Sequence, residues 1–226
     1  MNAEVIRIGA IVWKDLTAER RTKANFNAVA FLAGLILLMF GFALGPDNEA
    51  LRNVAGGVVW LTVLFSGVLS FNRSYEQELA NGALQTLLLY PGDRRSIFLG
   101  KLLANLTFVL LVEAVLVPLA AFLYDIPIWN AIVPLAVVLF LGTVGFVTLG
   151  TFYSAMASRL RAREVLLPLL LFPMLIPLLI AAVEATDAIL AGDLMDASGG
   201  WLKVLVVFDI VFFVGALFAF EHIIED

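Results

Sequence analysis

The chain has 226 residues, of which 62% are hydrophobic and only 15% are charged, with a mean hydropathy of +1.00, a net charge of −5 and no cysteine. A soluble domain is roughly 45–50% apolar and about 25% charged, so this composition requires lipid as a second apolar environment. The lack of cysteine excludes disulfides, thiolate metal sites, iron–sulfur clusters and thioether haem attachment. The negative net charge argues against nucleic acid as a partner.

Residues 1–25 predict an amphipathic helix that lies in the membrane interface. Its apolar and basic residues fall on two helical stripes, with Val5, Ile8, Val12 and Leu16 on one and Arg7, Lys14 and Arg21 on the other. Trp13 suits the depth of the lipid headgroups. The same pattern fits a helix packed on its own protein, and the two arrangements do not exclude each other.

Six apolar runs follow, each close to the length of about 20 residues that crosses a hydrocarbon core as a helix. They cover residues 26–45, 54–71, 102–123, 130–153, 165–184 and 201–220. The first run is too long for a cleaved signal and no A-x-A-like site follows it, so we expect it to remain as an anchor. The sequence therefore predicts an all-α membrane protein with six transmembrane helices in a single domain, residues 1–226.

The basic residues predict the topology. Twelve of the 14 lysines and arginines lie before the first span, between the second and third, or between the fourth and fifth. Arg52 and Lys203 lie on the opposite side. Because cationic loops stay on the cytoplasmic side, both termini are predicted to be cytoplasmic.

The cytoplasmic segment after the second span, residues 72–101, has the pattern of two short helices. Ser74 and Gln77 form a capping box that predicts the start of the first helix, and Asn81 with Gly82 predicts its end. A second helix is expected to end at Pro91.

This helical segment carries acids beside apolar residues. Glu76 and Glu78 precede leucines such as Leu84 and Leu87, which together form a surface suited to docking in a groove of another protein. The alternative is a helix that rests on the bilayer, which the acids disfavour because the cytoplasmic leaflet is anionic.

Motifs for catalysis are absent. The phosphate-binding pattern G-x-x-x-x-G-K-[ST] does not occur, so any ATPase must be another chain. His222 is the only histidine and has no cysteine or second histidine to pair with, so we expect neither a metal site nor an enzyme.

Three acids lie within or at the ends of predicted spans, where ionisable side chains are rare and mark candidate functional residues. Glu184, at the end of the fifth span, is expected to be interfacial, so Glu113 and Asp209 are the candidates. Glu113 must be protonated, paired or directed at a wet cavity, and Asn105 or a threonine of another helix is its expected partner. Glu113 could act in a substrate pathway or gate, or it could form a structural hydrogen bond between helices, and the sequence leaves both roles open. Asp209 occupies a similar position in the sixth span.

Prolines and small residues mark the later spans. Pro168, Pro173 and Pro177 predict a kinked or broken fifth helix, which would either line a moving or substrate-facing region or form a static kink. The fourth span is expected to pack closely on its neighbours through Gly142, Thr143, Gly145, Thr148, Gly150 and Thr151.

These features resemble permeases of the ABC-2 exporter type, which share six spans, an N-terminal interfacial helix and a helical loop after the second span. The match narrows further to the haem exporter B subunit of cytochrome c maturation. That similarity lies in residues 57–73 followed by Tyr75, Glu76, Glu78, Gly82, Leu84, Leu87, Pro91 and Lys101. The chain departs from the family at Asn72, where an acid is usual, and lacks the proline that some members carry after Gly142 and Thr143.

The resemblance implies a multi-pass permease subunit of the bacterial inner membrane. Its implied partners are a second copy of itself, a cytoplasmic ABC ATPase that uses ATP, and a haem-handling membrane protein. The resemblance implies that no cofactor is bound covalently and that haem is a possible substrate. Haem would either pass through this subunit or be moved by a partner protein that ATP hydrolysis drives. The ATPase-coupling role falls on Arg73, Tyr75, Glu76, Glu78, Gly82, Leu84, Leu87 and Pro91.

Two other functions stay open at this point. One is an ABC-2 permease that exports a lipid, a drug or a polysaccharide. The other is a secondary transporter that couples protons through Glu113 and Asp209, against which stands the lack of visible inverted repeats.

Overall fold

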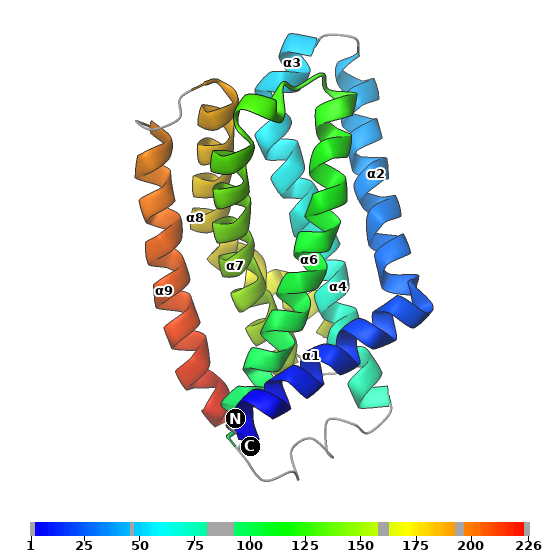
Figure 1. Cartoon of the computed structure of the whole chain (residues 1–226), viewed down its shortest axis with the longest axis vertical. Helices are drawn as coiled ribbons and strands as arrows, with labels where there is room; N and C mark the ends of the chain where they lie inside the picture. Colours follow the sequence, from blue (N-terminus) through cyan, green and yellow to red (C-terminus); the bar gives the residue numbers. More distant parts are fainter. Residues whose placement is uncertain (1–2, 46–47, 81–92, 158–162, 193–196, 224–226) are drawn as a thin grey trace.

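The computed structural model describes residues 3–45, 48–80, 93–157, 163–192 and 197–223 (Figure 1). All of its regular elements are helices: α1 Ala3–Thr22, α2 Ala24–Leu44, α3 Asn48–Asn53, α4 Ala55–Ala80, α6 Arg95–Leu123, η1 Ile128–Asn130, α7 Ile132–Ala157, α8 Arg163–Leu190 and α9 Ala197–Ile223. Within this part of the chain, six helices are long and apolar enough to cross a membrane. The predicted all-α class and all six predicted spans are confirmed.

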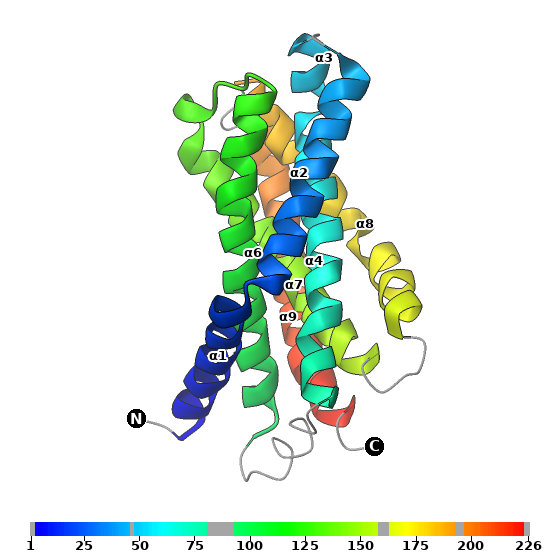
Figure 2. The ribbon, with the colours of Figure 1, turned by 90° about the vertical axis from the view of Figure 1, so that its right-hand side faces the viewer.

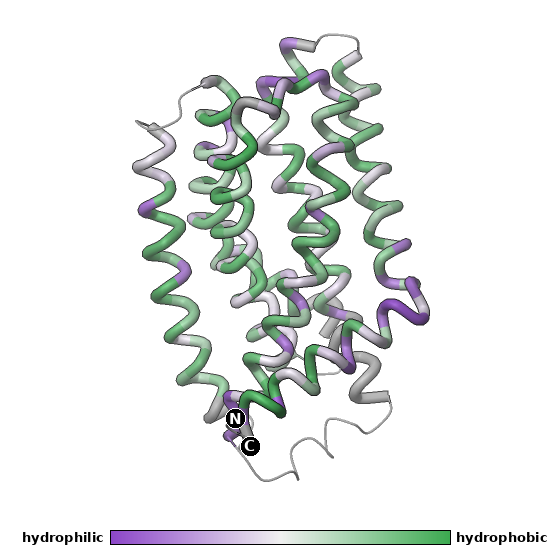
Figure 3. The backbone as a smooth tube through the Cα atoms, in the orientation of Figure 1, coloured by the Kyte–Doolittle hydropathy of each residue, from purple (hydrophilic) through white to green (hydrophobic). Residues whose placement is uncertain are grey.

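The six long helices stand side by side, and α1 crosses one end of the bundle (Figures 1 and 2). We call this end of the bundle the α1 end, and the start of α6 and the end of α9 also lie there. Helix α3 lies at the opposite end, which we call the α3 end. The long helices are mainly hydrophobic, and much of the polar sequence lies in α1 and near the helix ends (Figure 3). The basic segments before α2 and before α6 therefore share one end of the bundle, and the predicted cytoplasmic location of this end stays a prediction.

Helix α7 is at the centre of the packing and contacts α4, α6, α8 and α9. Its glycines make this possible. A Cβ atom at Gly142 would overlap the ring of Trp60, and one at Gly150 would overlap the ring of Phe71, both from α4. The predicted close approach of neighbouring helices to this span is confirmed.

Buried hydrogen bonds also join the helices, which matters because lipid offers no water to replace them. Trp60 Nε1 donates to Thr186 Oγ1 at 3.0 Å and links α4 to α8. Asn105 Nδ2 donates to Thr151 Oγ1 at 3.0 Å and links α6 to α7. The Tyr124 hydroxyl, at the end of α6, donates to the Leu37 carbonyl of α2 at 2.9 Å. Each such bond contributes roughly 0.6–2 kcal/mol in membrane proteins.

The prolines of the fifth span do not interrupt its helix. Pro168, Pro173 and Pro177 all lie inside α8, which is one continuous helix. A broken helix, one of the two predicted outcomes, is therefore wrong. Figure 2 shows the yellow N-terminal half of α8 leaning away from the bundle. Pro173 and Pro177 are exposed on its outer side, where a missing backbone donor does not disturb the packed face.

The predicted helix start at Ser74 is also wrong, because α4 runs without a break to Ala80. Residues 74–80 include Glu, Gln, Leu and Ala, which are good helix formers, so they extend the helix that precedes them. The predicted loop, residues 72–101, is thus helical up to Ala80 and again from Arg95. Its expected second helix lies outside the described residues.

We expect Gly150→Leu to lower the free energy of unfolding by about 1–3 kcal/mol, because the new side chain would force α4 and α7 apart at Phe71. Thermal unfolding in detergent measures this loss. Gly215→Leu is the matched control, since nothing lies within 4 Å of a Cβ atom there. Equal unfolding midpoints for the two variants would contradict a tight α4–α7 contact.

Candidate functional site

The first candidate region is the junction of α1 with the first turns of α6. A Cβ atom at Gly100 would lie 2.9 Å from the Cβ atom of Ile11, so the two helices touch closely here. Arg7 Nη1 donates a hydrogen bond to the backbone oxygen of Asp93 at 3.3 Å. Helix α1 therefore contacts α6 through residues one turn apart, namely Arg7, Ile11 and Asp15. The residues of the predicted apolar stripe lie outside this contact face and are half-buried or exposed.

A largely buried ion pair closes this junction. Lys101 Nζ lies 2.9 Å from Asp15 Oδ2, and the side chains are 1% and 20% exposed. A buried ammonium group needs its counter-charge, because no water is there to solvate it. The sequence shows Lys101 as a basic residue before a span and as part of the family resemblance, and no local pattern connects it to Asp15.

Asp93 organises the start of α6 as well as its contact with α1. Its Oδ1 accepts a hydrogen bond from the backbone N–H of Arg95 at 2.9 Å, and its backbone oxygen accepts one from Ser96 Oγ at 2.6 Å. These bonds satisfy groups at a helix terminus that have no partner within the helix. Through Arg7, the start of α6 and the interfacial helix α1 are held together.

The predicted ATPase-coupling residues fall in the last turns of α4 and in the segment that follows this helix in the sequence. Four of them occupy the last turns of α4 at the α1 end, namely Arg73, Tyr75, Glu76 and Glu78. The other four lie outside the described residues, namely Gly82, Leu84, Leu87 and Pro91. The first four therefore lie at the same end of the bundle as the α1–α6 junction, and the coupling role of the set stays a prediction.

Glu113 is buried between α6 and α7, with 3% of its surface exposed. Thr143 Oγ1 donates a hydrogen bond to Glu113 Oε1, so its partner is a threonine of another helix, one of the two predicted types. Asn105 bonds to Thr151 instead. The second oxygen, Glu113 Oε2, has no hydrogen-bond partner among the described residues. Within the described part of the chain, this carboxyl group is therefore only half satisfied.

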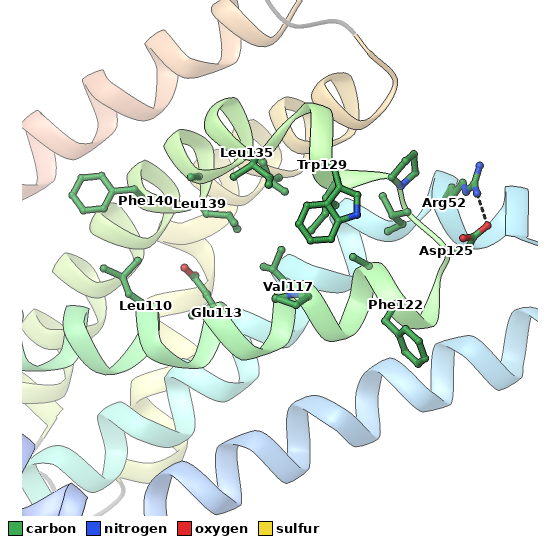
Figure 4. Close-up of a pocket in the computed structure, with 18 residues that line it drawn as sticks. Arg52, Leu110, Glu113, Val117, Phe122, Asp125, Trp129, Leu135, Leu139 and Phe140 are labelled. Atoms are coloured by element: carbon green, nitrogen blue, oxygen red, sulfur yellow. Dashed lines mark hydrogen bonds and ion pairs between the residues drawn. The ribbon is translucent and has the colours of Figure 1, made fainter.

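Beside Glu113, a groove of about 900 Å³ runs between α6 and α7 (Figure 4). Its wall is mainly apolar and includes Leu110, Val117, Phe122, Trp129, Leu135, Leu139 and Phe140. Towards the α3 end it reaches the ion pair between Arg52 Nη2 and Asp125 Oδ2, at 2.7 Å. Trp129 is 80% exposed at the rim. We call this space the α6–α7 groove.

Asp209 of α9 approaches α7 from a different side. A Cβ atom at Gly145 would lie 2.5 Å from Asp209 Oδ1, and neither carboxyl oxygen of Asp209 has a hydrogen-bond partner among the described residues. Positions two residues apart point about 200° apart around a helix, so Thr143 and Gly145 face different neighbours. The structure thus places Glu113 and Asp209 against different faces of α7.

Comparison with known proteins decides the family. The profile of the CcmB protein matches residues 6–226. The chain belongs to the CcmB protein family. The resemblance seen in the sequence is thereby confirmed.

Curated relatives of this CcmB-family chain are named heme exporter protein B. The protein of Haemophilus influenzae is 31% identical over 197 residues, which are 86% of this chain and 86% of the relative. That of Rhodobacter capsulatus is 31% identical over 175 residues, 77% of this chain and 80% of the relative. That of Pseudomonas aeruginosa is 30% identical over 173 residues, 76% and 77% of the two chains.

We expect Lys101→Met to lower the free energy of unfolding by about 1–3 kcal/mol, because it removes the buried partner of Asp15 and leaves this carboxylate only the more exposed Lys14, whose Nζ lies 3.3 Å from Asp15 Oδ1. Adding Asp15→Leu should recover part of this loss, since an apolar replacement of a buried ion pair is often tolerated. Thermal unfolding in detergent measures both effects.

The control for this prediction is Arg52→Met, which breaks the exposed ion pair with Asp125 at the α3 end. Exposed pairs contribute about 1 kcal/mol or less, so the unfolding midpoint should change little. A loss as large as that of Lys101→Met would show that burial of the Asp15–Lys101 pair has no special effect.

Proposed function

We propose that this chain is the membrane subunit of an ABC transporter complex that acts in haem delivery or export for cytochrome c maturation. In this proposal it couples ATP hydrolysis by a separate ATPase to movement of its membrane helices. The observation that carries the proposal is membership of the CcmB family, whose curated relatives are named heme exporter protein B. The sequence has no phosphate-binding motif of its own, so a partner chain must hydrolyse ATP.

The ATPase is proposed to dock at the α1 end, on the cytoplasmic side. This end carries the basic segments that stay cytoplasmic, and it carries the last turns of α4 with Glu76 and Glu78. These acids and the leucines that follow form the surface proposed to enter a groove of the ATPase.

The α1–α6 junction supports a mechanical coupling. Ile11 is packed on Gly100 and Asp15 is paired with Lys101, so α1 and the start of α6 are fixed to each other. Closely packed elements transmit displacement because they cannot deform continuously. A force that the ATPase applies between α4 and α6 would therefore move α1 and α6 together.

Haem ligands are proposed to come from another membrane subunit. Histidine and cysteine are common protein ligands of haem iron, beside methionine and tyrosine. The chain has no cysteine, and its one histidine, His222, lies near the C-terminus. We propose that this subunit acts with a second copy of itself. ATP hydrolysis relayed by the pair would then drive a haem-handling partner. Passage of haem through the spans is the competing route.

The test is an affinity purification from gently solubilised native membranes, with mass spectrometry of the partners and an absorbance spectrum of the eluate. We expect an ATPase subunit, haem-handling membrane proteins and a haem spectrum, and loss of c-type cytochromes when the gene is deleted. An ATPase without haem proteins would favour export of another substrate. Intact c-type cytochromes after deletion would contradict the proposal.

For the docking surface, we expect Glu76→Lys and Leu84→Asp each to reduce ATPase recovery in this purification by roughly fivefold or more, the effect of losing one strong contact. Membrane insertion should be unchanged, because both substitutions lie outside the apolar spans. Glu49→Lys reverses an exposed charge at the α3 end and is the control. Undiminished ATPase recovery in both docking variants would contradict this surface.

A further inference from the structure

A row of small residues lines the α6–α7 groove. Ala114, Pro118 and Ala121 follow one another at helical spacing on α6, and Ala136 adds a small residue from α7. Ala114, Pro118 and Ala136 are exposed, so none of the described helices covers them. In membranes, a face of small residues allows another helix to approach closely.

Glu113 gives this apolar groove a specific chemical requirement. Its carboxyl group is directed into the space between α6 and α7 (Figure 4), one residue before Ala114. It is 3% exposed, and only one of its oxygens is bonded, to Thr143. A half-satisfied acid at lipid depth costs free energy until a hydrogen-bond donor reaches it. The occupant that best fits the groove therefore combines an apolar surface with one donor.

We propose that the α6–α7 groove receives a transmembrane helix of a different membrane subunit, and that a side-chain N–H or O–H donor of this helix binds Glu113. The α6 wall of the groove extends from Leu110 to Phe122, which corresponds to about 18 Å of helix. This length suits several turns of a partner helix. The polar groups that line the groove are Glu113 near one end and the Arg52–Asp125 pair near the other, whereas the few polar groups of a small-ligand site converge on one place.

The same observations disfavour two other occupants. A lipid acyl chain fills an apolar groove but brings no donor to Glu113. A second copy of this chain is disfavoured by the donors on its described spans. The exposed donors Asn27 and Lys203 lie within the first two turns of their helices, and the half-exposed Thr107 hydroxyl already donates to the Leu103 carbonyl. A subunit of different sequence is therefore the occupant we infer.

The inference rests on the proposed function in one respect, since it requires a second kind of membrane subunit in the complex. The groove begins near Glu113 and runs towards the α3 end, whereas the ATPase is proposed to dock at the α1 end. Loss of the helix partner and loss of the ATPase are therefore separate observations.

The first test is photo-cross-linking in native membranes of the intact complex. Benzoyl-phenylalanine replaces Ala136 in the groove or, as a control, Ala43, an exposed alanine on α2. We expect the probe at position 136, and not at 43, to label a transmembrane peptide of another protein that has a donor side chain within one turn of the attachment point. Labelling of lipid alone or of a second copy would overturn the inference.

The second test measures recovery of that labelled membrane protein with groove variants. Ala136→Trp fills the groove without altering Glu113, and Glu113→Leu removes the acceptor. We expect each to reduce recovery about threefold to thirtyfold, the effect of one interhelical hydrogen bond, with a smaller reduction for Glu113→Gln. ATPase recovery should stay unchanged. Unchanged recovery of the helix partner in both Ala136→Trp and Glu113→Leu would overturn the inference.

Ser66→Ala tests whether Glu113 binds a partner helix or instead serves a hydrogen-bond network inside this chain. Glu113 also borders a cavity of about 10 Å³ beside Ser66, whose hydroxyl has no hydrogen-bond partner among the described residues. Such a cavity holds one water molecule at most. We expect Ser66→Ala to leave partner recovery unchanged, and a loss as large as that of Glu113→Leu would overturn the inference. If the unmodified chain brings down no ATPase, the proposed function fails instead.

Discussion

The contact of α7 with four neighbouring helices is the constraint on which the rest of this structure depends. Lipid is as apolar as a leucine side chain, so helices in a membrane associate through close packing and hydrogen bonds rather than through removal from water. Gly142 and Gly150 admit the rings of Trp60 and Phe71, which brings α4 onto α7. The position of α6 beside this pair then sets where Glu113 lies.

The two ends of the bundle differ in their physical character. At the α1 end, Asp15, Lys101 and the capped start of α6 form a polar junction that joins an interfacial helix to a span. Towards the α3 end, α6 and α7 separate and leave an apolar groove open. A rigid polar junction suits transmission of force from a cytoplasmic partner, and an open apolar groove suits contact within the membrane.

The two intramembrane acids are not parts of one site. Glu113 bonds to Thr143 and borders the groove, whereas Asp209 lies against Gly145 on another face of α7. A proton path shared by the two would have to pass around this helix. Their separation therefore gives no support to the proton-coupled transporter that the sequence left open, and it favours distinct roles for the two residues.

The sequence by itself determined the number of spans and the family, because hydropathy and similarity are read along the chain, and its loop charges predict the sidedness. Only the tertiary structure decided that α4 continues through Ser74, that Lys101 pairs with Asp15 and that Thr143 bonds to Glu113. The physical reason is the solvent. In lipid, both the packed and the outer faces of a helix are apolar, so periodicity does not reveal which residues meet.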